Sequence, residues 1–161
     1  MPMEVYYETY ESPLGVFYII FSSQGVIRLD LTQEKFEKRC AQCIKGKYDE
    51  ARKQLKEYFI GKRSKFSLPL YLNGTTFQKK VWEAIERIPC GETRSYQWVA
   101  REIGSPKASR AVGNALGANP IPIIVPCHRI IKTNGEIGGY GGGEKLKTEL
   151  LEHEKNFITS K

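Results

Sequence analysis

The segment SYQWVAREIGSPKASRAVGNALG (residues 95–117) decides how the C-terminal half of the chain folds. Its apolar spacing predicts two short helices, at about 95–103 and 106–117. The Gly-Ser-Pro sequence at 104–106 between them suits a left-handed residue that ends one helix, then the cap and first turn of the next. Two helices joined by so short a turn are typical of a helix-turn-helix.

The second of these helices has an unusually bare outer face. Its expected buried face contains Ala108, Ala111, Val112, Ala115 and Leu116, and its outer stripe contains Arg110, Gly113, Asn114 and Gly117. A helix that recognises bases in the major groove would carry several long polar side chains there. Each interior glycine costs about 1 kcal/mol of helix stability relative to alanine. The glycines therefore indicate a close approach to the backbone, either by DNA or by another helix of the protein.

The charge pattern favours DNA. The chain has a formal net charge of +7, and no acidic residue occurs between Ile103 and Gly135. The same stretch contains four basic residues, Lys107, Arg110, Arg129 and Lys132. Such a stretch favours contact with a phosphate backbone.

The rest of the chain predicts an α+β protein with two domains. Residues 1–75 are expected to form a small α/β domain with its connector, and residues 76–161 a mostly helical domain. The first domain should hold a three-stranded antiparallel sheet, with strands at 3–10, 14–21 and 25–31, a helix near 49–60 and an extended connector at 62–75. At the boundary, Thr75 and Gln78 have the spacing of a capping box, which predicts that the second domain begins with a helix.

Composition and cysteine usage limit the functional classes. Hydrophobic residues make up 40% of the 161-residue chain, but no apolar run approaches the ~20 residues that a membrane span requires. The first residues show no secretion signal, so a cytoplasmic protein is expected. Cys40 and Cys43 have a redox-like spacing without the surrounding βαβ pattern, which leaves surface thiols, a disulfide or a redox pair open. No set of metal ligands is recognisable, so no metal is expected.

The segment IPIIVPCHR (residues 121–129) contains the candidate nucleophile. Its apolar run should be buried and stiff, and it ends by presenting Cys127 next to His128. An adjacent base or cation increases the thiolate fraction of a cysteine, whose ordinary pKa is about 8.5. We therefore expect Cys127 to be an activated nucleophile rather than an inert buried thiol.

A carboxylate that could orient His128 is expected in the last helix, at 144–156. Glu154 falls within the apolar arc that Leu150 and Leu151 define, where a charge is unfavourable unless it is paired. His128 is the natural partner, although Lys145 or a fraying helix end would also explain the position. Between these elements, residues 130–137 predict a hairpin with an Asn-Gly turn, and the glycines at 138–143 a close-fitting pocket wall.

Several of these motifs together resemble the O6-alkylguanine-DNA alkyltransferases, also called methylated-DNA–protein-cysteine methyltransferases. The resemblance rests first on PCHR at 126–129 and extends over most of 76–156. It includes GETRSY at 91–96, RAVG at 110–113, NPIP at 119–122, GGY at 138–140 and LLEHE at 150–154.

The resemblance implies a DNA-repair enzyme that transfers an alkyl group from O6-alkylguanine, less readily from O4-alkylthymine, to its own Cys127 in a single turnover. It implies that His128 removes the thiol proton through a water, that Glu154 orients His128 and that Asn119 braces the turn before the cysteine. Tyr96 would help to rotate the nucleotide and protonate guanine N3, and Arg110 would fill the vacated stack from a helix in the minor groove. The further implied residues are Gly113, Asn114, Lys107 and Arg129 at the DNA, and Ile130, Tyr140 and Gly141 in the pocket wall.

The expected partner is double-stranded DNA carrying O6-alkylguanine, bound by a monomer without a cofactor. Gly141 departs from many relatives, which carry a serine whose side chain can reach the guanine O6. The main alternative is a non-catalytic alkyltransferase-like protein that binds lesions, but such proteins lack the cysteine found here at position 127.

Overall fold

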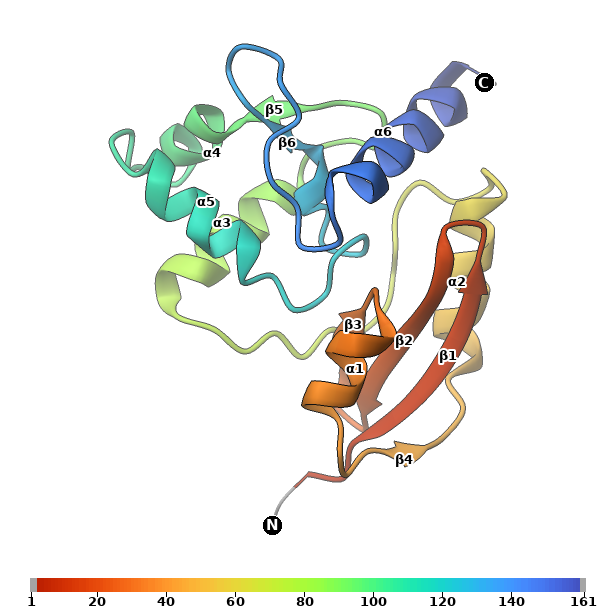
Figure 1. Ribbon diagram of the computed structural model, residues 1–161. Coiled ribbons are helices and arrows are strands. Elements are labelled where there is room, and N and C mark those ends of the chain that lie inside the picture. The colour runs from red at the N-terminus through yellow and green to blue at the C-terminus, as the bar shows by residue number, and fades with distance from the viewer. Residues whose placement is uncertain (1–2, 160–161) are drawn as a thin grey trace. The chain divides into compact units, whose positions relative to one another are not determined.

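The computed structural model describes residues 3–159 and divides into two units between Leu72 and Asn73. Each unit is described by itself (Figure 1).

The N-terminal unit is built on a four-stranded sheet in the order β3-β2-β1-β4. The strands β1 (Tyr6–Ser12), β2 (Gly15–Ser22) and β3 (Gly25–Asp30) form the predicted antiparallel meander. The sequence did not predict β4 (Ile44–Lys45), which pairs parallel to β1. Two exposed residues carry no alternating pattern, so nothing in the sequence distinguishes this strand from a loop.

Two helices cover opposite faces of this sheet. Phe36 of α1 (Gln33–Arg39) stacks on Tyr18, and Phe59 of α2 (Asp49–Phe59) contacts Phe17. Because successive residues of a strand point to opposite faces, Phe17 and Tyr18 place the two helices on different sides. The sequence predicted α2 but not α1, which buries none of its residues and so has no apolar stripe.

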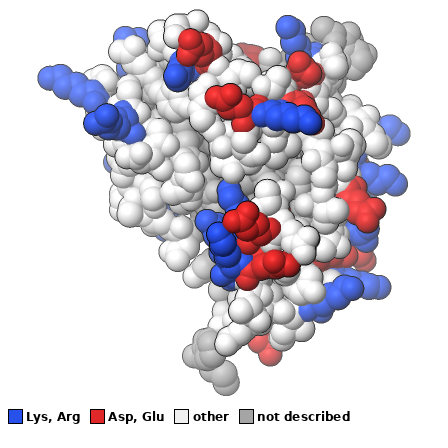
Figure 2. Space-filling model, viewed as in Figure 1, with Lys and Arg blue, Asp and Glu red and all other residues white. Residues whose placement is uncertain are grey.

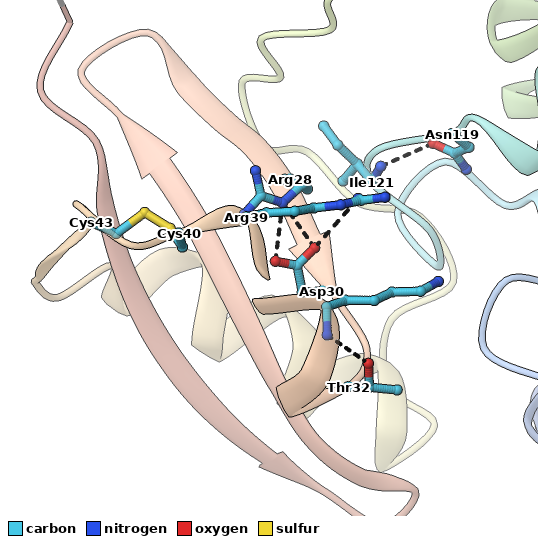
Figure 3. Close-up of polar contacts among 9 residues, drawn as sticks. Arg28, Asp30, Thr32, Arg39, Cys40, Cys43, Asn119 and Ile121 are labelled. Atoms are coloured by element: carbon cyan, nitrogen blue, oxygen red, sulfur yellow. Dashed lines mark hydrogen bonds and ion pairs between the residues drawn. A yellow bond between two sulfur atoms is a disulfide. The ribbon is translucent and has the colours of Figure 1, made fainter. Parts of the chain in front are cut away.

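A polar cluster and a disulfide hold the C-terminal end of α1 (Figure 3). The carboxylate of Asp30, at the end of β3, accepts two hydrogen bonds from Arg28 Nε at 2.8 and 3.0 Å. It also lies 4.0 Å from the guanidinium of Arg39 in the last turn of α1. Directly after that turn, Cys40 forms a disulfide with Cys43. Together with the packing of Phe36 on the sheet, the cluster and the disulfide therefore hold a helix in which no residue is fully buried.

The C-terminal unit is mostly helical, as predicted. The helix α3 (Thr76–Glu86) begins with the Thr75–Gln78 capping box, and Trp82 donates a hydrogen bond to the carbonyl of Ala115 at 2.9 Å. The remaining elements are β5 (Arg94–Ser95), α4 (Tyr96–Glu102), α5 (Ser109–Gly117), the 3-10 turn η1 (Cys127–Arg129), β6 (Ile130–Ile131) and α6 (Glu144–Thr159). Among residues 3–159, no helix is both long and apolar enough to span a membrane.

Two local predictions for this unit were wrong. The helix α5 begins at Ser109 rather than near 106, because the amide of Ala108 bonds to the Ser105 carbonyl at 2.9 Å and closes a separate turn first. Ala111, which was expected on the buried face of this helix, is exposed. The segment 130–137 does form its Asn-Gly turn, but β6 pairs parallel with β5 instead of forming a hairpin ladder.

Removal of the disulfide should affect stability alone. A cross-link over so short a loop contributes about 2 kcal/mol through the entropy of the unfolded chain. We expect Cys40→Ser/Cys43→Ser to lower the melting temperature by several degrees and to leave the rate of the alkyl transfer that the resemblance implies nearly unchanged in the folded protein. The measurement is thermal unfolding with and without reductant, together with single-turnover kinetics. A large loss of rate at an unchanged melting temperature would contradict this assignment.

Candidate active site

A cavity of about 250 Å³ in the C-terminal unit contains the buried thiol of Cys127. Tyr96 of α4 and two glycines of α5, Gly113 and Gly117, form part of its lining. The opposite part is the loop segment Gly139, Tyr140 and Gly141. The pocket therefore lies against the bare stripe of α5 and the glycine-rich segment, the two features that the sequence marked as sites of close approach.

The turn before Cys127 is held by Asn119, as Figure 3 shows in part. The side chain of Asn119 accepts a hydrogen bond from the amide of Ile121 at 3.0 Å and donates one to the Val125 carbonyl at 2.8 Å. Between these two residues, Ile123 has a φ of +74°, a conformation that is strained for a β-branched residue. The asparagine thus closes a turn that the backbone alone does not favour, and this turn presents Cys127.

Glu154 of α6 joins the two residues that follow the cysteine. His128 Nε2 lies 2.6 Å from Glu154 Oε2, and Arg129 donates to Glu154 Oε1 from Nε at 2.8 Å. Arg129 also donates to the carbonyl of Ile88, beyond the end of α3, at 2.7 Å. His128 and Glu154 are fully buried. The contact between Glu154 and His128 that the sequence predicted is therefore present. Arg129 is a second partner of the same carboxylate.

The protonation states follow from this geometry. Burial alone would raise the pKa of Glu154, but the opposing effects of His128 and Arg129 hold it well below its usual range. Burial lowers the pKa of His128, although Glu154 acts in the other direction. An ionised carboxylate only accepts hydrogen bonds, so the neutral imidazole must carry its proton on Nε2. The lone pair of Nδ1 remains available for a proton from a nucleophile.

Two tyrosines of the cavity keep their protons in an apolar setting. Burial and the charge of Cys127 raise the pKa of Tyr96 and, to a greater extent, that of Tyr140. The Tyr140 hydroxyl and His128 Nδ1 are buried without a hydrogen-bond partner among residues 3–159. The Tyr96 hydroxyl lies against Gly138, where an added Cβ would come within 2.8 Å of it. A glycine at 138 is therefore needed for Tyr96 to occupy this position.

The residues expected at the DNA divide into an exposed and a buried group. Lys107, Arg110 and Asn114 are exposed on α5 and the turn before it. Figure 2 shows basic side chains that project at the α4–α5 turn, beside a largely uncharged surface. Arg129 does not belong with them, because it is 6% exposed and paired with Glu154. The expectation that Arg129 contacts DNA was wrong, since a basic run in the sequence does not show which of its members is buried.

Sequence reasoning missed Lys147 of α6, a buried residue whose ammonium donates three hydrogen bonds to main-chain carbonyls. The sequence did contain a signal for this residue. Lys147 lies three residues before Leu150 and seven before Glu154, so it falls on the same apolar arc that drew attention to the glutamate.

Comparison with known proteins decides the family. The family model "6-O-methylguanine DNA methyltransferase, DNA binding domain" matches residues 76–156, and the model of the ribonuclease-like domain of the same family matches residues 5–72. The chain belongs to the 6-O-methylguanine DNA methyltransferase family.

Individual members of the family are similar over nearly the whole chain. The constitutive methylated-DNA–protein-cysteine methyltransferase of Bacillus subtilis is 48% identical, covering 93% of this chain and 95% of that protein. The corresponding protein of Methanosarcina barkeri is 45% identical, covering 96% and 99%. The crystal structure of Mycobacterium tuberculosis O6-methylguanine methyltransferase superposes with a TM-score of 0.89 at 43% identity, covering 94% and 93%. A structure of the M. tuberculosis protein in complex with DNA also has a TM-score of 0.89, at 42% identity and with 94% of each chain covered.

Loss of the buried carboxylate should destabilise the C-terminal unit. Glu154→Gln leaves Arg129 and His128 without their counter-charge, and breaking a buried ion pair costs about 3–5 kcal/mol. The depressed pKa of Glu154 means that its contribution is complete above the unfolded value of about 4.3 and declines as the pH falls toward the folded value. We therefore expect the stability difference between wild type and variant to be large at neutral pH and to narrow in acid.

The measurement is chemical denaturation at neutral pH and at about pH 3, below the ordinary glutamate pKa. Glu152→Gln, an exposed position on the same helix, is the matched control and should change little at either pH. A difference for Glu154→Gln that is independent of pH would argue against an ionised carboxylate.

Proposed function

We propose that the protein repairs double-stranded DNA by transferring an alkyl group from the O6 of guanine to Cys127, in one irreversible turnover. The observation that carries this proposal is the position of Cys127 in a cavity, next to a neutral histidine that a buried carboxylate orients. The family supports repair by alkyl transfer, and the geometry of this chain indicates which groups perform it.

The chemistry begins with His128. Its Nδ1 accepts the thiol proton of Cys127 through a water, and Glu154 stabilises the imidazolium that forms. The thiolate attacks the alkyl carbon in line with the carbon–oxygen bond, a carbon–sulfur bond forms, and guanine leaves with the bonding electrons. The Tyr96 hydroxyl, whose raised pKa keeps it protonated, supplies a proton to guanine N3. The thioether is stable to hydrolysis, so the protein is consumed.

The damaged base must leave the double helix to reach the cavity. The exposed stripe of α5 has glycines at 113 and 117, so DNA can approach the helix backbone closely, and both glycines also line the cavity. Arg110 is the long side chain of this stripe and is exposed. We propose that α5 enters the minor groove, that Arg110 occupies the space of the rotated nucleotide, and that Lys107 and Asn114 contact the backbone.

All groups that this mechanism uses come from residues 96–154 of one chain, so we propose that a monomer acts. A lesion-binding protein without catalysis is the other candidate. The thiol of Cys127 in the cavity wall argues against it, because a protein that only binds lesions needs no nucleophile there.

Replacement of the nucleophile separates these two functions. We expect Cys127→Ser to abolish transfer and to retain binding of duplex DNA, with a preference for duplexes that contain O6-methylguanine. The measurement is a binding titration with lesion-containing and unmodified duplexes, together with a transfer assay. Transfer by Cys127→Ser at the wild-type rate would overturn the acceptor assignment. The matched control is Cys90→Ser, at another buried cysteine, which should transfer the alkyl group as the wild type does.

The proposed role of Arg110 predicts a dependence on the state of the substrate. Extrusion of a base costs a few kcal/mol in a duplex and less where the base is already unpaired. We expect Arg110→Ala to slow repair of a duplex on the order of tenfold or more, since about 1.4 kcal/mol corresponds to a factor of ten, and to affect single-stranded DNA only slightly. Single-turnover rates on both substrates provide the measurement.

Lys107→Ala is the comparison variant. Loss of a phosphate contact should weaken binding to every duplex sequence and reduce the slope of its salt dependence by roughly one unit. If Arg110→Ala slows repair of both substrates equally, Arg110 is another backbone contact and does not fill the stack.

A further inference from the structure

The N-terminal unit contains a cavity of its own, far along the chain from Cys127. Its volume is about 420 Å³, within the range of roughly 300–1,000 Å³ that is usual for small-molecule sites. Its floor lies on the face of the sheet that α1 covers, because Ile20 in the floor pairs with Tyr7, whose ring contacts Phe36 of α1. The Cys40–Cys43 disulfide, which follows α1, forms part of the wall. All of the lining comes from residues 3–44.

Aliphatic side chains and a methionine form the apolar part of this cavity. Ile20 is 1% exposed and forms the floor, whereas Met3 and Ile44 at the rim are 38% and 51% exposed. Val5 and Ile27 complete the apolar lining. Apolar side chains that gather at a cavity and remain open to solvent are typical of a binding site. This part of the cavity favours an apolar ligand group.

An irregularity in β3 directs two side chains to the cavity. Phe21 of β2 pairs with Val26, but the next residue of β2, Ile20, pairs with Arg28, so Ile27 is an extra residue in β3. Bulges of this kind change the direction of side chains and are frequent next to functional sites. Here the extra residue and Arg28 both line the cavity.

Arg28 brings an unused hydrogen-bond donor to this apolar setting. Its Nε donates to both oxygens of Asp30, but its Nη2 is buried without a hydrogen-bond partner among residues 3–159. A buried donor without an acceptor is unfavourable. The Asp30 carboxylate also lies 4.0 Å from the guanidinium of Arg39, another residue of the lining. Two guanidinium groups therefore share one carboxylate (Figure 3), which leaves an excess of positive charge.

The other carboxylate of the lining does not supply the missing acceptor. Glu4 accepts a hydrogen bond from the hydroxyl of Tyr6. Tyr6 stacks on Phe21, and both precede or follow residues of the cavity face by one position, so their rings lie on the opposite face of the sheet. Glu4 is thus held by a residue of the other face, and Arg28 Nη2 remains available to a ligand.

We propose that this cavity binds a small amphiphilic anion, whose carboxylate or phosphate group accepts hydrogen bonds from Arg28 and whose apolar chain covers Val5, Ile20 and Ile27. The anionic group neutralises the excess charge beside Asp30, and a charge-assisted hydrogen bond to Nη2 is stronger than a neutral one. The proposal gives the N-terminal unit a binding function that does not depend on alkyl transfer to Cys127.

The test uses four probes on the full chain. Octanoate and octyl phosphate combine an anionic group with an apolar chain, octanol has only the chain, and inorganic phosphate has only the charge. Binding would be measured by calorimetric titration, and the site located from the amide chemical shifts that change. We expect at least one of the two amphiphilic anions to bind with a stoichiometry of one, with shifts concentrated in residues 3–44, and the tighter of them identifies the anionic group. Equal affinity for octanol or for inorganic phosphate would overturn the proposal, since each lacks one of the two required features.

Replacement of Arg28 tests the anion contact. We expect Arg28→Gln to weaken binding of the amphiphilic anion on the order of tenfold, because it removes a charged donor. The matched control is Arg52→Gln, on α2 at the opposite face of the sheet, with a side chain that is 51% exposed. This control should bind the anion as the wild type does.

A second pair of variants does not depend on changing a buried ion pair. Ile44→Asp places a negative charge at the rim of the cavity and should also weaken binding, by repulsion. Ile60→Asp, at an equally exposed isoleucine outside the lining, should not. An affinity that neither Arg28→Gln nor Ile44→Asp reduces would overturn the proposal. Methyl transfer by these variants is measured separately, so a failure of the proposed function is distinguishable from a failure of this site.

Discussion

The buried carboxylate of Glu154 is the constraint on which the active site depends. An ionised group inside a protein is strongly unfavourable unless its oxygens are paired, and here His128 and Arg129 satisfy both of them. These partners come directly after Cys127 in the chain, and Arg129 also donates a hydrogen bond to the carbonyl of Ile88. The need to pair one charge therefore fixes α6, the turn that carries the nucleophile and the end of α3 against one another.

The same carboxylate determines what His128 can do. A histidine that pairs with an ionised glutamate through Nε2 has its lone pair on Nδ1, and burial keeps it neutral near physiological pH. Lys147, which has the opposite charge, lies on the same arc of α6, seven residues before Glu154. One helix face thus contributes an anion that orients the base and a cation that touches the wall of the pocket, while the apolar residues between them, such as Leu150, remain in the core.

Much of this could be predicted from the sequence, because the decisive signals were residues in unfavourable places. A carboxylate on the apolar arc of a helix predicted the pairing of Glu154 with His128, which the structure contains. The close approach to the backbone that the glycines on the outer stripe of α5 indicate stays a prediction. The exposure of single residues was harder to predict. Arg129 was assigned to DNA although it is buried, and Ala111 to the core although it is exposed, since the exposure of both depends on where neighbouring elements pack. The helix α1 has no apolar face and β4 has two residues, so local pattern indicates neither.

The most direct test of the central claim is the intact mass of the protein before and after incubation with an excess of O6-methylguanine duplex DNA, followed by peptide mapping. We expect the mass to increase by a single methyl group in place of hydrogen and then to stop, with the modification on Cys127 and none on Cys40, Cys43 or Cys90. The DNA should lose one lesion per protein molecule. An unchanged mass with bound lesion DNA, or the loss of more than one lesion per protein, would contradict a stoichiometric transfer to Cys127.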